Sequence, residues 1–414
     1  KLKLMHKLYK IISYFLIPVI KINTFIRILN KKEDKIRYKE RFGFTNLQKP
    51  LGKELIWIHA SSVGEFKSSD FLINNFFNNY NILITTTTKT AADYAITNYG
   101  DKIIHQYAPY DVTFWINKFL DFWQPKLVIW IESDLWPNTI VRLRERKITS
   151  VFLNARISPK SFNKWKYFSS YYKFITKTFF AIYAQSQNDL KRIESLTNNE
   201  VQYLGNLKLT NKFRKLPNSS TSTGMNIMIA STHHNEEQLI MPYIENISKK
   251  YPLINFFIIP RHPERSKIIF ELFRSKKLNV GLHSRIKNSK FQFLIIDSFG
   301  KMDEFYDKSD IVILGGSFTN NGGHNPIEAA VANCAIITGP HIFNWQNLYE
   351  DMIKKNCCLK IENSKELEHN IINLIEDKSQ ISNLKQNALS FSESVFFDED
   401  KLINVINSKL EYNA

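Results

Sequence analysis

The segment LIWIHASSVGE (55–65) joins an uninterrupted apolar run to a polar stretch that contains a glycine. The apolar run does not alternate with polar residues, which is typical of a parallel strand covered on both faces. Gly64 and Glu65 then open a stretch of helical length. The segment therefore predicts one strand–helix unit of a doubly wound α/β sheet.

The same strand–helix pattern continues along the chain. Further strands are predicted at 81–86, 126–131, 149–154, 227–230, 253–259, 293–296, 311–314 and 335–338, with helices between them, for example at 88–98 and 136–147. The polar stretch 211–226 interrupts the pattern and has the Pro, Gly, Ser and Thr content of a linker. We therefore expect two Rossmann-like domains, 31–210 and 227–414, that face a central cleft, with a separate segment 1–30 before them.

The composition agrees with two folded domains. The chain has 414 residues, of which 43% are hydrophobic, and this is enough apolar material for two cores and excludes a mainly disordered chain. The three cysteines, Cys334, Cys357 and Cys358, do not have the spacing of a zinc site. We expect them to be buried thiols in a reducing compartment.

The first residues carry much of the net charge of +17, because residues 1–41 hold twelve Lys and Arg against three Asp and Glu. Such a patch suits either nucleic-acid phosphates or anionic lipid headgroups. The apolar run 11–20 is half the length that spans a bilayer, and it contains Pro18. We interpret 1–30 as an anchor in the membrane interface, with no nucleic acid as partner. A secretory signal and a buried first helix are the alternatives.

Polar groups follow nearly every predicted strand. In open α/β sheets, ligands bind beyond the carboxyl ends of the strands. Groups that could bind a phosphate or a sugar at these positions include His59, Thr85–Lys89, Glu132, Asn154, Lys208, His233, Arg261, Asp297 and Gly315–Ser317. Their recurrence in both halves predicts a functional cleft.

Two of these groups suggest specific chemistry. Glu65 lies in the first turn of its helix, where it either accepts a proton from a substrate hydroxyl or stabilises the helix N-terminus. Arg261 follows the apolar run 253–259 and predicts an anion site, and Lys208 is placed similarly.

The stretch GGHNP (322–326) leads into a helix with Glu328 in its first turn. A helix start of this kind suits an anion, although a plain tight turn is the alternative. His59 and His324 either contact a ligand or are core and turn residues. The one Asp-x-Asp pattern, 398–400, is expected on a solvated face, and we predict no metal and no cofactor.

Ten stretches, taken together and in order, resemble the 3-deoxy-D-manno-octulosonic acid (Kdo) transferases of lipopolysaccharide biosynthesis, glycosyltransferase family 30. They are IWIHASSVGE (56–65), TTTTKT (85–90), IWIESDLWPN (129–138), NARIS (154–158), GNLK (205–208), ASTH (230–233), IIPRHPER (258–265), DSFGKM (297–302), GGSFTNNGGHNPIEAA (315–330) and ITGPHIFNW (337–345). They cover nearly the whole chain.

The resemblance implies a GT-B fold and an inverting, metal-independent enzyme. The donor would be CMP-Kdo and the acceptor a lipid A precursor, lipid IV-A, at the cytoplasmic face of the inner membrane, where the protein would be monotopic or held by a single N-terminal anchor. Glu65 would be the proton acceptor, and Glu132 and Lys208 would stabilise the transition state. The residues that would bind CMP are Pro260, Arg261, Phe299, Gly300, Lys301, Asn325, Pro326, Ile327 and Glu328.

Lys301 departs from the family pattern, which usually has an acidic residue at this position. Two other functional interpretations of the whole chain remain. One is a different GT-B enzyme that uses a UDP-sugar. The other is a non-catalytic basic adaptor for membranes or nucleic acid.

Overall fold

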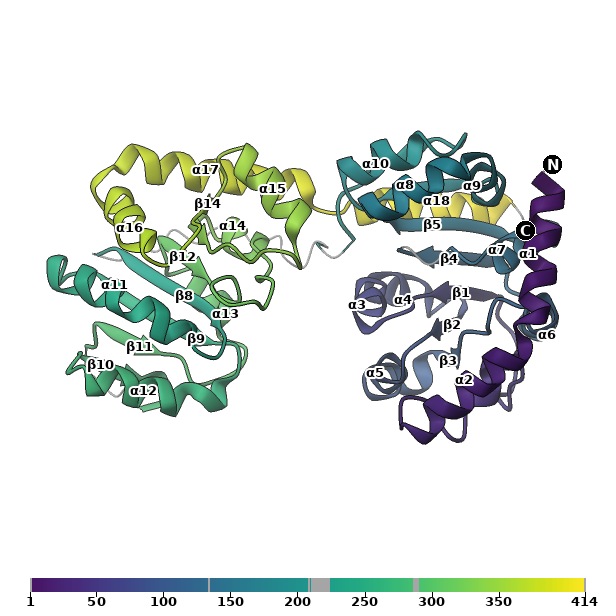
Figure 1. Cartoon of the computed structure of the whole chain (residues 1–414), viewed down its shortest axis with the longest axis horizontal. Coiled ribbons are helices and arrows are strands. Elements are labelled where there is room, and N and C mark those ends of the chain that lie inside the picture. The colour runs from purple at the N-terminus through teal and green to yellow at the C-terminus, as the bar shows by residue number, and fades with distance from the viewer. Residues whose placement is uncertain (1, 133–134, 208, 210–223, 286–289, 413–414) are drawn as a thin grey trace. The chain divides into compact units, whose positions relative to one another are not determined.

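The computed structural model describes residues 2–132, 135–207, 209, 224–285 and 290–412. It consists of two α/β units, the first formed by Lys1–Asn211 with Phe396–Ala414 and the second by Lys212–Val395. Each unit has a seven-stranded parallel sheet with helices packed on it (Figure 1). The predicted fold class, two doubly wound domains in tandem, is confirmed.

In the first unit the strands lie in the order β3-β2-β1-β4-β5-β6-β7. They are β1 (Leu55–His59), β2 (Asn81–Thr86), β3 (Ile104–Tyr107), β4 (Leu127–Ile131), β5 (Thr149–Ala155), β6 (Ala181–Ala184) and β7 (Val201–Gln202). The helices are α1 (Leu2–Phe15), α2 (Ile17–Leu29), α3 (Val63–Ser68), α4 (Asp70–Phe76), α5 (Lys89–Tyr99), α6 (Thr113–Trp123), α7 (Pro137–Glu145), α8 (Pro159–Tyr167), α9 (Ser169–Thr176), α10 (Gln187–Glu194) and α18 (Glu399–Tyr412).

In the second unit the order is β10-β11-β9-β8-β12-β13-β14. The strands are β8 (Asn226–Thr232), β9 (Asn255–Pro260), β10 (Val280–Leu282), β11 (Phe293–Ile295), β12 (Ile311–Leu314), β13 (Ala335–Thr338) and β14 (Leu359–Lys360). The helices are α11 (Glu236–Lys250), α12 (Ser266–Ser275), α13 (Met302–Tyr306), α14 (Ile327–Val331), α15 (Gln346–Lys354), α16 (Glu366–Glu376) and α17 (Lys378–Val395).

Strand β1 shows why apolar runs without alternation mark these sheets. Ile56 and Ile58 pack into one buried cluster, and Leu55 and Trp57 pack into a second cluster on the opposite face. Both faces of the strand are therefore removed from water, which is the arrangement expected of a parallel sheet that is covered on two sides.

The second domain was predicted to span 227–414, and its C-terminal boundary was wrong. Residues Phe396–Ala414 return to the first unit, where Leu402, Ile406 and Leu410 of α18 pack into the core. These three side chains recur every four residues and so share one face of the helix. Most of the predicted linker 211–226, namely residues 211–223, lies outside the described residues.

Gly205 allows this return of the chain. A side chain at this position would place its Cβ 1.9 Å from the carbonyl oxygen of Phe396, and the φ angle is +93°. Only glycine adopts such a backbone without strain. The main chain is joined there by two hydrogen bonds, from Phe397 N to Leu209 O and from Asp398 N to Leu204 O, 2.9 and 2.7 Å long.

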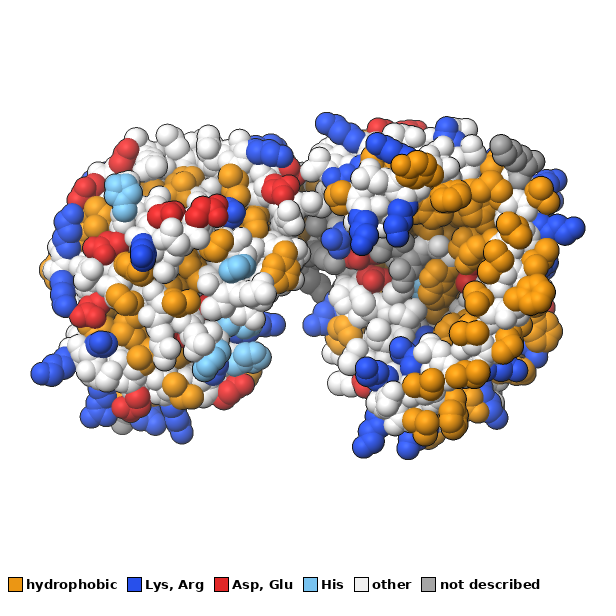
Figure 2. Space-filling model, in the orientation of Figure 1, with side chains coloured by type: hydrophobic (Ala, Val, Ile, Leu, Met, Phe, Trp, Pro, Cys, Tyr) orange, Lys and Arg blue, Asp and Glu red, His pale blue; other side chains and the backbone are white. Residues whose placement is uncertain are grey.

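Helices α1 and α2 pack on the first unit, and their buried side chains are polar. Their buried residues are Ser13 and Thr24, whose hydroxyls contact Asn138 Nδ2 at 3.1 Å and Tyr110 Oη at 2.9 Å. The large apolar side chains face outward and form a continuous orange band over both helices (Figure 2). This outer apolar face consists of Leu4, Leu8, Ile11, Ile12, Phe15, Leu16, Val19, Ile22, Phe25, Ile26 and Leu29.

The alternative of a buried first helix is therefore wrong. Among the described helices, none alone is both long and apolar enough to cross a membrane. Helices α1 and α2 reach that length and composition only as a pair, and they are bent by 50° relative to each other.

Candidate functional site

Two of the three candidate catalytic residues, Glu65 and Glu132, follow neighbouring strands of the first sheet. Strand β1 lies between β2 and β4, with His59 paired to Thr85 on one side and Trp130 on the other. Because all the strands are parallel, the segments that follow β2, β1, β4 and β5 meet at the carboxyl edge. The structure thus brings Glu65 and Glu132 to neighbouring positions of this edge.

Glu65 is part of a capping box at the start of α3. Its backbone N–H donates to Ser62 Oγ at 3.4 Å, while the Ser62 hydroxyl donates to Glu65 Oε1 at 3.1 Å and Ser61 N–H donates to Oε2 at 2.6 Å. This reciprocal pattern stabilises helix starts. The carboxylate is half-buried. Glu65 is thus oriented by its own helix, and the two roles predicted for it are compatible.

Glu132 follows β4 with a φ of +65°, a left-handed conformation that is uncommon outside glycine. Its Oε1 accepts a hydrogen bond of 3.2 Å from Asn154 Nδ2, and Asn154 itself has a φ of +52°. Both side chains are buried. Strained residues of this kind concentrate at functional sites, because the surrounding structure must hold them in place.

Lys208, the third predicted catalytic residue, lies outside the described residues. Its neighbour Leu207 is fully buried in the core of the first unit.

His59 belongs to the core below this edge. It is fully buried between Trp130 and Trp136, and burial lowers the pKa of its imidazole to about 3, so the ring is neutral. Its Nδ1 lies 2.9 Å from Thr85 Oγ1 and its Nε2 lies 3.2 Å from Ser61 Oγ. His59 therefore helps to hold Ser61 in place, and its ring has no access to solvent.

A buried ion pair links this edge to α2, and sequence reasoning missed it. Arg41 and Glu33 are almost completely buried and lie 3.1 Å apart. Arg41 also donates to Thr87 O at 2.7 Å, and Thr87 donates to Ser61 O through both its backbone N–H and its hydroxyl, at 3.0 and 2.9 Å. Glu33 in turn pairs with Arg27 of α2 at 3.3 Å.

In the second unit, the predicted nucleotide-binding residues gather around Glu328 in α14. Burial and the nearby Asp303 raise the pKa of the Glu328 carboxyl to about 6, and Arg261 and a hydrogen bond from Asn325 oppose that rise. Arg261 is exposed at the end of β9, where its backbone N–H donates to Thr232 O at 3.0 Å. A cation and a carboxyl of raised pKa thus face the same region, which is typical of a binding site.

The other predicted nucleotide contacts differ in exposure. Ile327 and Pro326 are buried, so they could contact a ligand only through the backbone.

The segment that contains Phe299 is more open. Phe299 is 80% exposed, and Gly300 next to it has a φ of +75° with open space around its Cα. Lys301 is the residue before the first turn of α13, and its ammonium group pairs with Glu304 at 2.9 Å. Helix α13 packs against α14, which brings this segment beside Glu328. Pro260 ends β9, next to Arg261.

Glu236 organises the glycine-rich loop after β12 and was not singled out from the sequence. Its fully buried carboxylate accepts hydrogen bonds from the backbone N–H groups of His233, Gly316 and Phe318 at 2.8, 2.7 and 2.9 Å. Three charge-assisted hydrogen bonds satisfy a carboxylate that would otherwise be costly to bury. The two adjacent glutamates at the start of α11, Glu236 and Glu237, were the one feature of the sequence that could have indicated this role.

His233 and His324 stack on each other with their Nε2 atoms 2.9 Å apart. Burial, His233 and Arg261 lower the pKa of His324 to about 4, so the pair is neutral at pH 7. Arg265 forms a salt bridge with Glu237 at 2.7 Å. Within the described ranges, no group of three or more His, Cys, Asp or Glu side chains is placed to hold a metal ion.

Comparisons with known proteins give a consistent result. Residues 36–211 match the family described as "3-Deoxy-D-manno-octulosonic-acid transferase (kdotransferase)". A 3-deoxy-D-manno-octulosonic acid transferase of Rickettsia bellii is 33% identical over 405 residues, covering 94% of this chain and 96% of the relative. The enzyme of the same name from Haemophilus influenzae is 30% identical over 411 residues, with 94% and 96% covered.

A solved structure of Acinetobacter baumannii MurG has a TM-score of 0.56 and covers 86% of this chain and 100% of its own, at 9% identity. At this identity the likeness concerns the fold alone. It supports the GT-B fold.

Proposed function

Because the chain belongs to the Kdo transferases, glycosyltransferases of lipopolysaccharide biosynthesis, we propose that it moves Kdo from CMP-Kdo to lipid IV-A with inversion at the anomeric carbon. The observation that carries the proposal is similarity to Kdo transferases over nearly the full length of the chain and of its relatives.

Glu65 is the proposed proton acceptor. The acceptor hydroxyl donates its proton to the carboxylate as its oxygen attacks the anomeric carbon of Kdo, and the bond to the CMP phosphate breaks on the opposite face. The hydrogen bonds from Ser61 and Ser62 orient the carboxylate before the substrate arrives. Glu132 and Lys208 are proposed to stabilise the charge that develops in this step.

Arg261 and the start of α14 are the proposed donor site. A guanidinium suits the single phosphate of CMP, which gains charge as it leaves. Glu328 is proposed to accept hydrogen bonds from the ribose hydroxyls, with Asn325 beside it. One phosphate can be neutralised by these groups, and we propose that transfer needs no metal and no cofactor.

Membrane attachment is proposed to occur through the outer apolar face of α1 and α2. Its aliphatic and aromatic side chains are exposed, and twelve basic residues occupy positions 1–41. Apolar burial combined with attraction to anionic lipids is the usual basis of interfacial binding. The proposed location is therefore the cytoplasmic face of the inner membrane.

Calorimetry with CMP and with UDP tests the donor assignment, and Arg261→Ala tests its phosphate contact. We expect CMP to bind more tightly than UDP. Arg261→Ala should weaken CMP binding by about 1.5–3 kcal/mol, the value of a charge-assisted hydrogen bond. Arg274→Ala, at an exposed position of α12, is the control. Tighter binding of UDP would favour the UDP-sugar alternative, and an unchanged CMP affinity would remove Arg261 from the site.

A further inference from the structure

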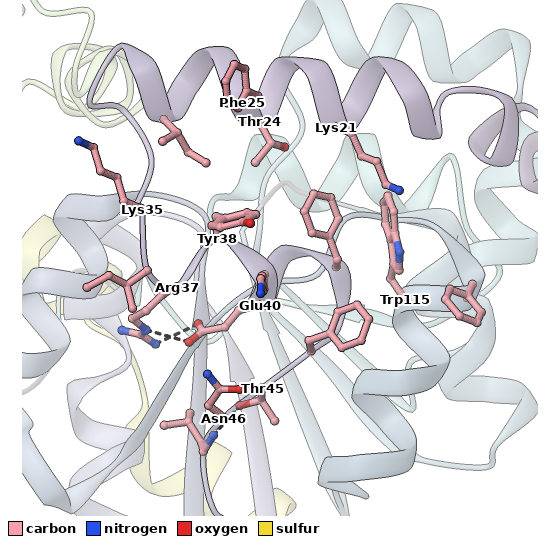
Figure 3. Close-up of a pocket in the computed structure, with 17 residues that line it drawn as sticks. Lys21, Thr24, Phe25, Lys35, Arg37, Tyr38, Glu40, Thr45, Asn46 and Trp115 are labelled. Carbon is pink, nitrogen blue, oxygen red and sulfur yellow. Dashed lines mark hydrogen bonds and ion pairs between the residues drawn. The ribbon is translucent and has the colours of Figure 1, made fainter.

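The first unit contains a cavity of about 1160 Å³ beneath α2 that the catalytic site does not use. Helix α2 forms one wall with Lys21, Thr24 and Phe25, and the segment 35–47 and the start of α6 form the others (Figure 3).

The walls of this cavity, here called the α2 cavity, are largely apolar. Phe25, Phe44 and Phe114 line it and are each at least half exposed, whereas Trp115, which also lines it, is buried. The ammonium group of Lys118 lies 3.7 Å from the centre of the Phe44 ring. The free energy of the system falls when an apolar chain replaces the water between exposed aromatic side chains.

The lining of the α2 cavity is also positively charged. Four cationic side chains line it, Lys21, Lys35, Arg37 and Lys39, against the single carboxylate of Glu40. Arg37 already pairs with Glu40 at 2.8 Å. The three lysines are exposed, so the positive charge is presented to solvent around an apolar interior.

The α2 cavity is continuous with the outer apolar face, because Phe25 belongs to both. An acyl chain that enters from a membrane lying on α1 and α2 would therefore pass along Phe25 to reach the cavity. The charge pattern selects a lipid with an anionic headgroup over a neutral one.

We propose that the α2 cavity binds one anionic phospholipid of the bulk membrane. An acyl chain packs against Phe25, Phe44 and Phe114, and the phosphate contacts Lys21, Lys35 and Lys39. The proposal rests on the proposed membrane attachment and gives it a specific lipid site beneath the anchor helices.

The test uses the full chain on phosphatidylcholine vesicles that contain a small fraction of phosphatidylglycerol with a photoreactive group in its acyl chain. After illumination, the cross-linked residues are mapped by mass spectrometry. We expect cross-links to residues 24–47 and 114–115, at least fivefold above those obtained when the same group is carried by phosphatidylcholine.

Two pairs of variants separate this site from general attraction. Lys35→Glu with Lys39→Glu should reduce the cavity cross-links at least fivefold. The control variant combines Lys31→Glu with Lys32→Glu, which makes the same change of charge at exposed residues that do not line the cavity. This variant should leave the cavity cross-links unchanged. The double variant Phe44→Ser with Phe114→Ser should likewise reduce the cavity cross-links at least fivefold. Phe168→Ser, at an exposed position elsewhere, should not reduce them. Circular dichroism checks that each variant is folded.

Cross-links confined to the outer apolar face would overturn the proposal. Equal loss in both lysine pairs, or equal labelling by phosphatidylcholine and phosphatidylglycerol, would also overturn it. Labelling only by a photoreactive lipid A precursor would assign the cavity to the acceptor and reject the bulk lipid. Kdo transfer is measured separately in detergent, so an inactive wild-type protein would contradict the proposed function without affecting this result.

Discussion

The backbone N–H of Ser61 donates to Glu65 Oε2 across 2.6 Å, so the proposed catalytic carboxylate is held at the N-terminus of its own helix. A carboxylate in this position satisfies backbone N–H groups at the start of the helix, and these hydrogen bonds fix its orientation. The segment after β1 therefore places the base and also orients it.

Ser62→Ala should weaken this arrangement. Ser62 is the N-cap of α3, and loss of such a cap costs about 1 kcal/mol of stability. We expect a lower midpoint in urea unfolding, with reduced turnover and unchanged CMP affinity. Ser158→Ala, which removes the N-cap of α8, is the matched control and should lower stability alone. Turnover equal in the two variants would show that the cap has no part in orienting Glu65.

Arg41→Ala should be among the most destabilising substitutions in the first unit. It leaves the Glu33 carboxylate buried and removes the donor to Thr87 O, and breaking a buried pair in this way costs about 3–5 kcal/mol. Arg142→Ala breaks a pair whose side chains are partly exposed, and should cost about 1 kcal/mol or less. Urea unfolding measures both. Similar costs for the two variants would contradict a structural role for the buried pair.

The nucleoside affinity of the second unit should rise with pH around 6. Burial raises the pKa of Glu328 to about 6, and the proposed contact with the ribose hydroxyls requires the ionised form. Cytidine, which lacks a titrating phosphate, should bind several-fold more tightly at pH 7 than at pH 5.5, and Glu328→Gln should remove this dependence. A wild-type affinity that does not change over this range would remove Glu328 from the ribose site.

The same pKa has a consequence of opposite sign for stability. Because the folded pKa is raised above the model-compound value of 4.5, the protonated carboxyl favours the folded state. This contribution is fully present below pH 4.5 and is lost as the pH rises through about 6. Glu328→Gln should remove this component of the pH dependence of unfolding.

The outer apolar face should govern vesicle binding. Replacing Leu8, Phe15 and Ile22 by serine removes exposed apolar groups without touching the inward Ser13 and Thr24. We expect the triple variant to remain folded and to stay in the supernatant when vesicles containing phosphatidylglycerol are sedimented. Wild-type levels of sedimentation would show that attachment lies elsewhere.

The sequence was sufficient to predict the long central strands and the polar segments after them. Strand β12 matched its predicted bounds, 311–314, because an apolar run that is buried on both faces leaves an unambiguous pattern. Strands β3, β6, β7, β10 and β14 were not predicted. They have two to four residues each, and so short a run carries little pattern.

Three features depended on tertiary structure. Helix α18 has an ordinary amphipathic pattern, and nothing local indicates which of the two cores its apolar face meets. Arg41 lies in a basic stretch that resembles a solvated surface, yet it is buried because Glu33 is positioned to pair with it. Glu236 was likewise hidden, because its partners are backbone N–H groups from a loop 80 residues away in sequence.

Transfer of Kdo by Glu65→Gln tests the central claim most directly. The purified variant is incubated with CMP-Kdo and lipid IV-A, and the product is followed by mass spectrometry, with Glu54→Gln at the opposite end of β1 as the matched control. The account predicts that Glu65→Gln still binds CMP but forms no Kdo-lipid product, while Glu54→Gln and the wild-type protein both form it. Substantial turnover by folded Glu65→Gln would contradict it.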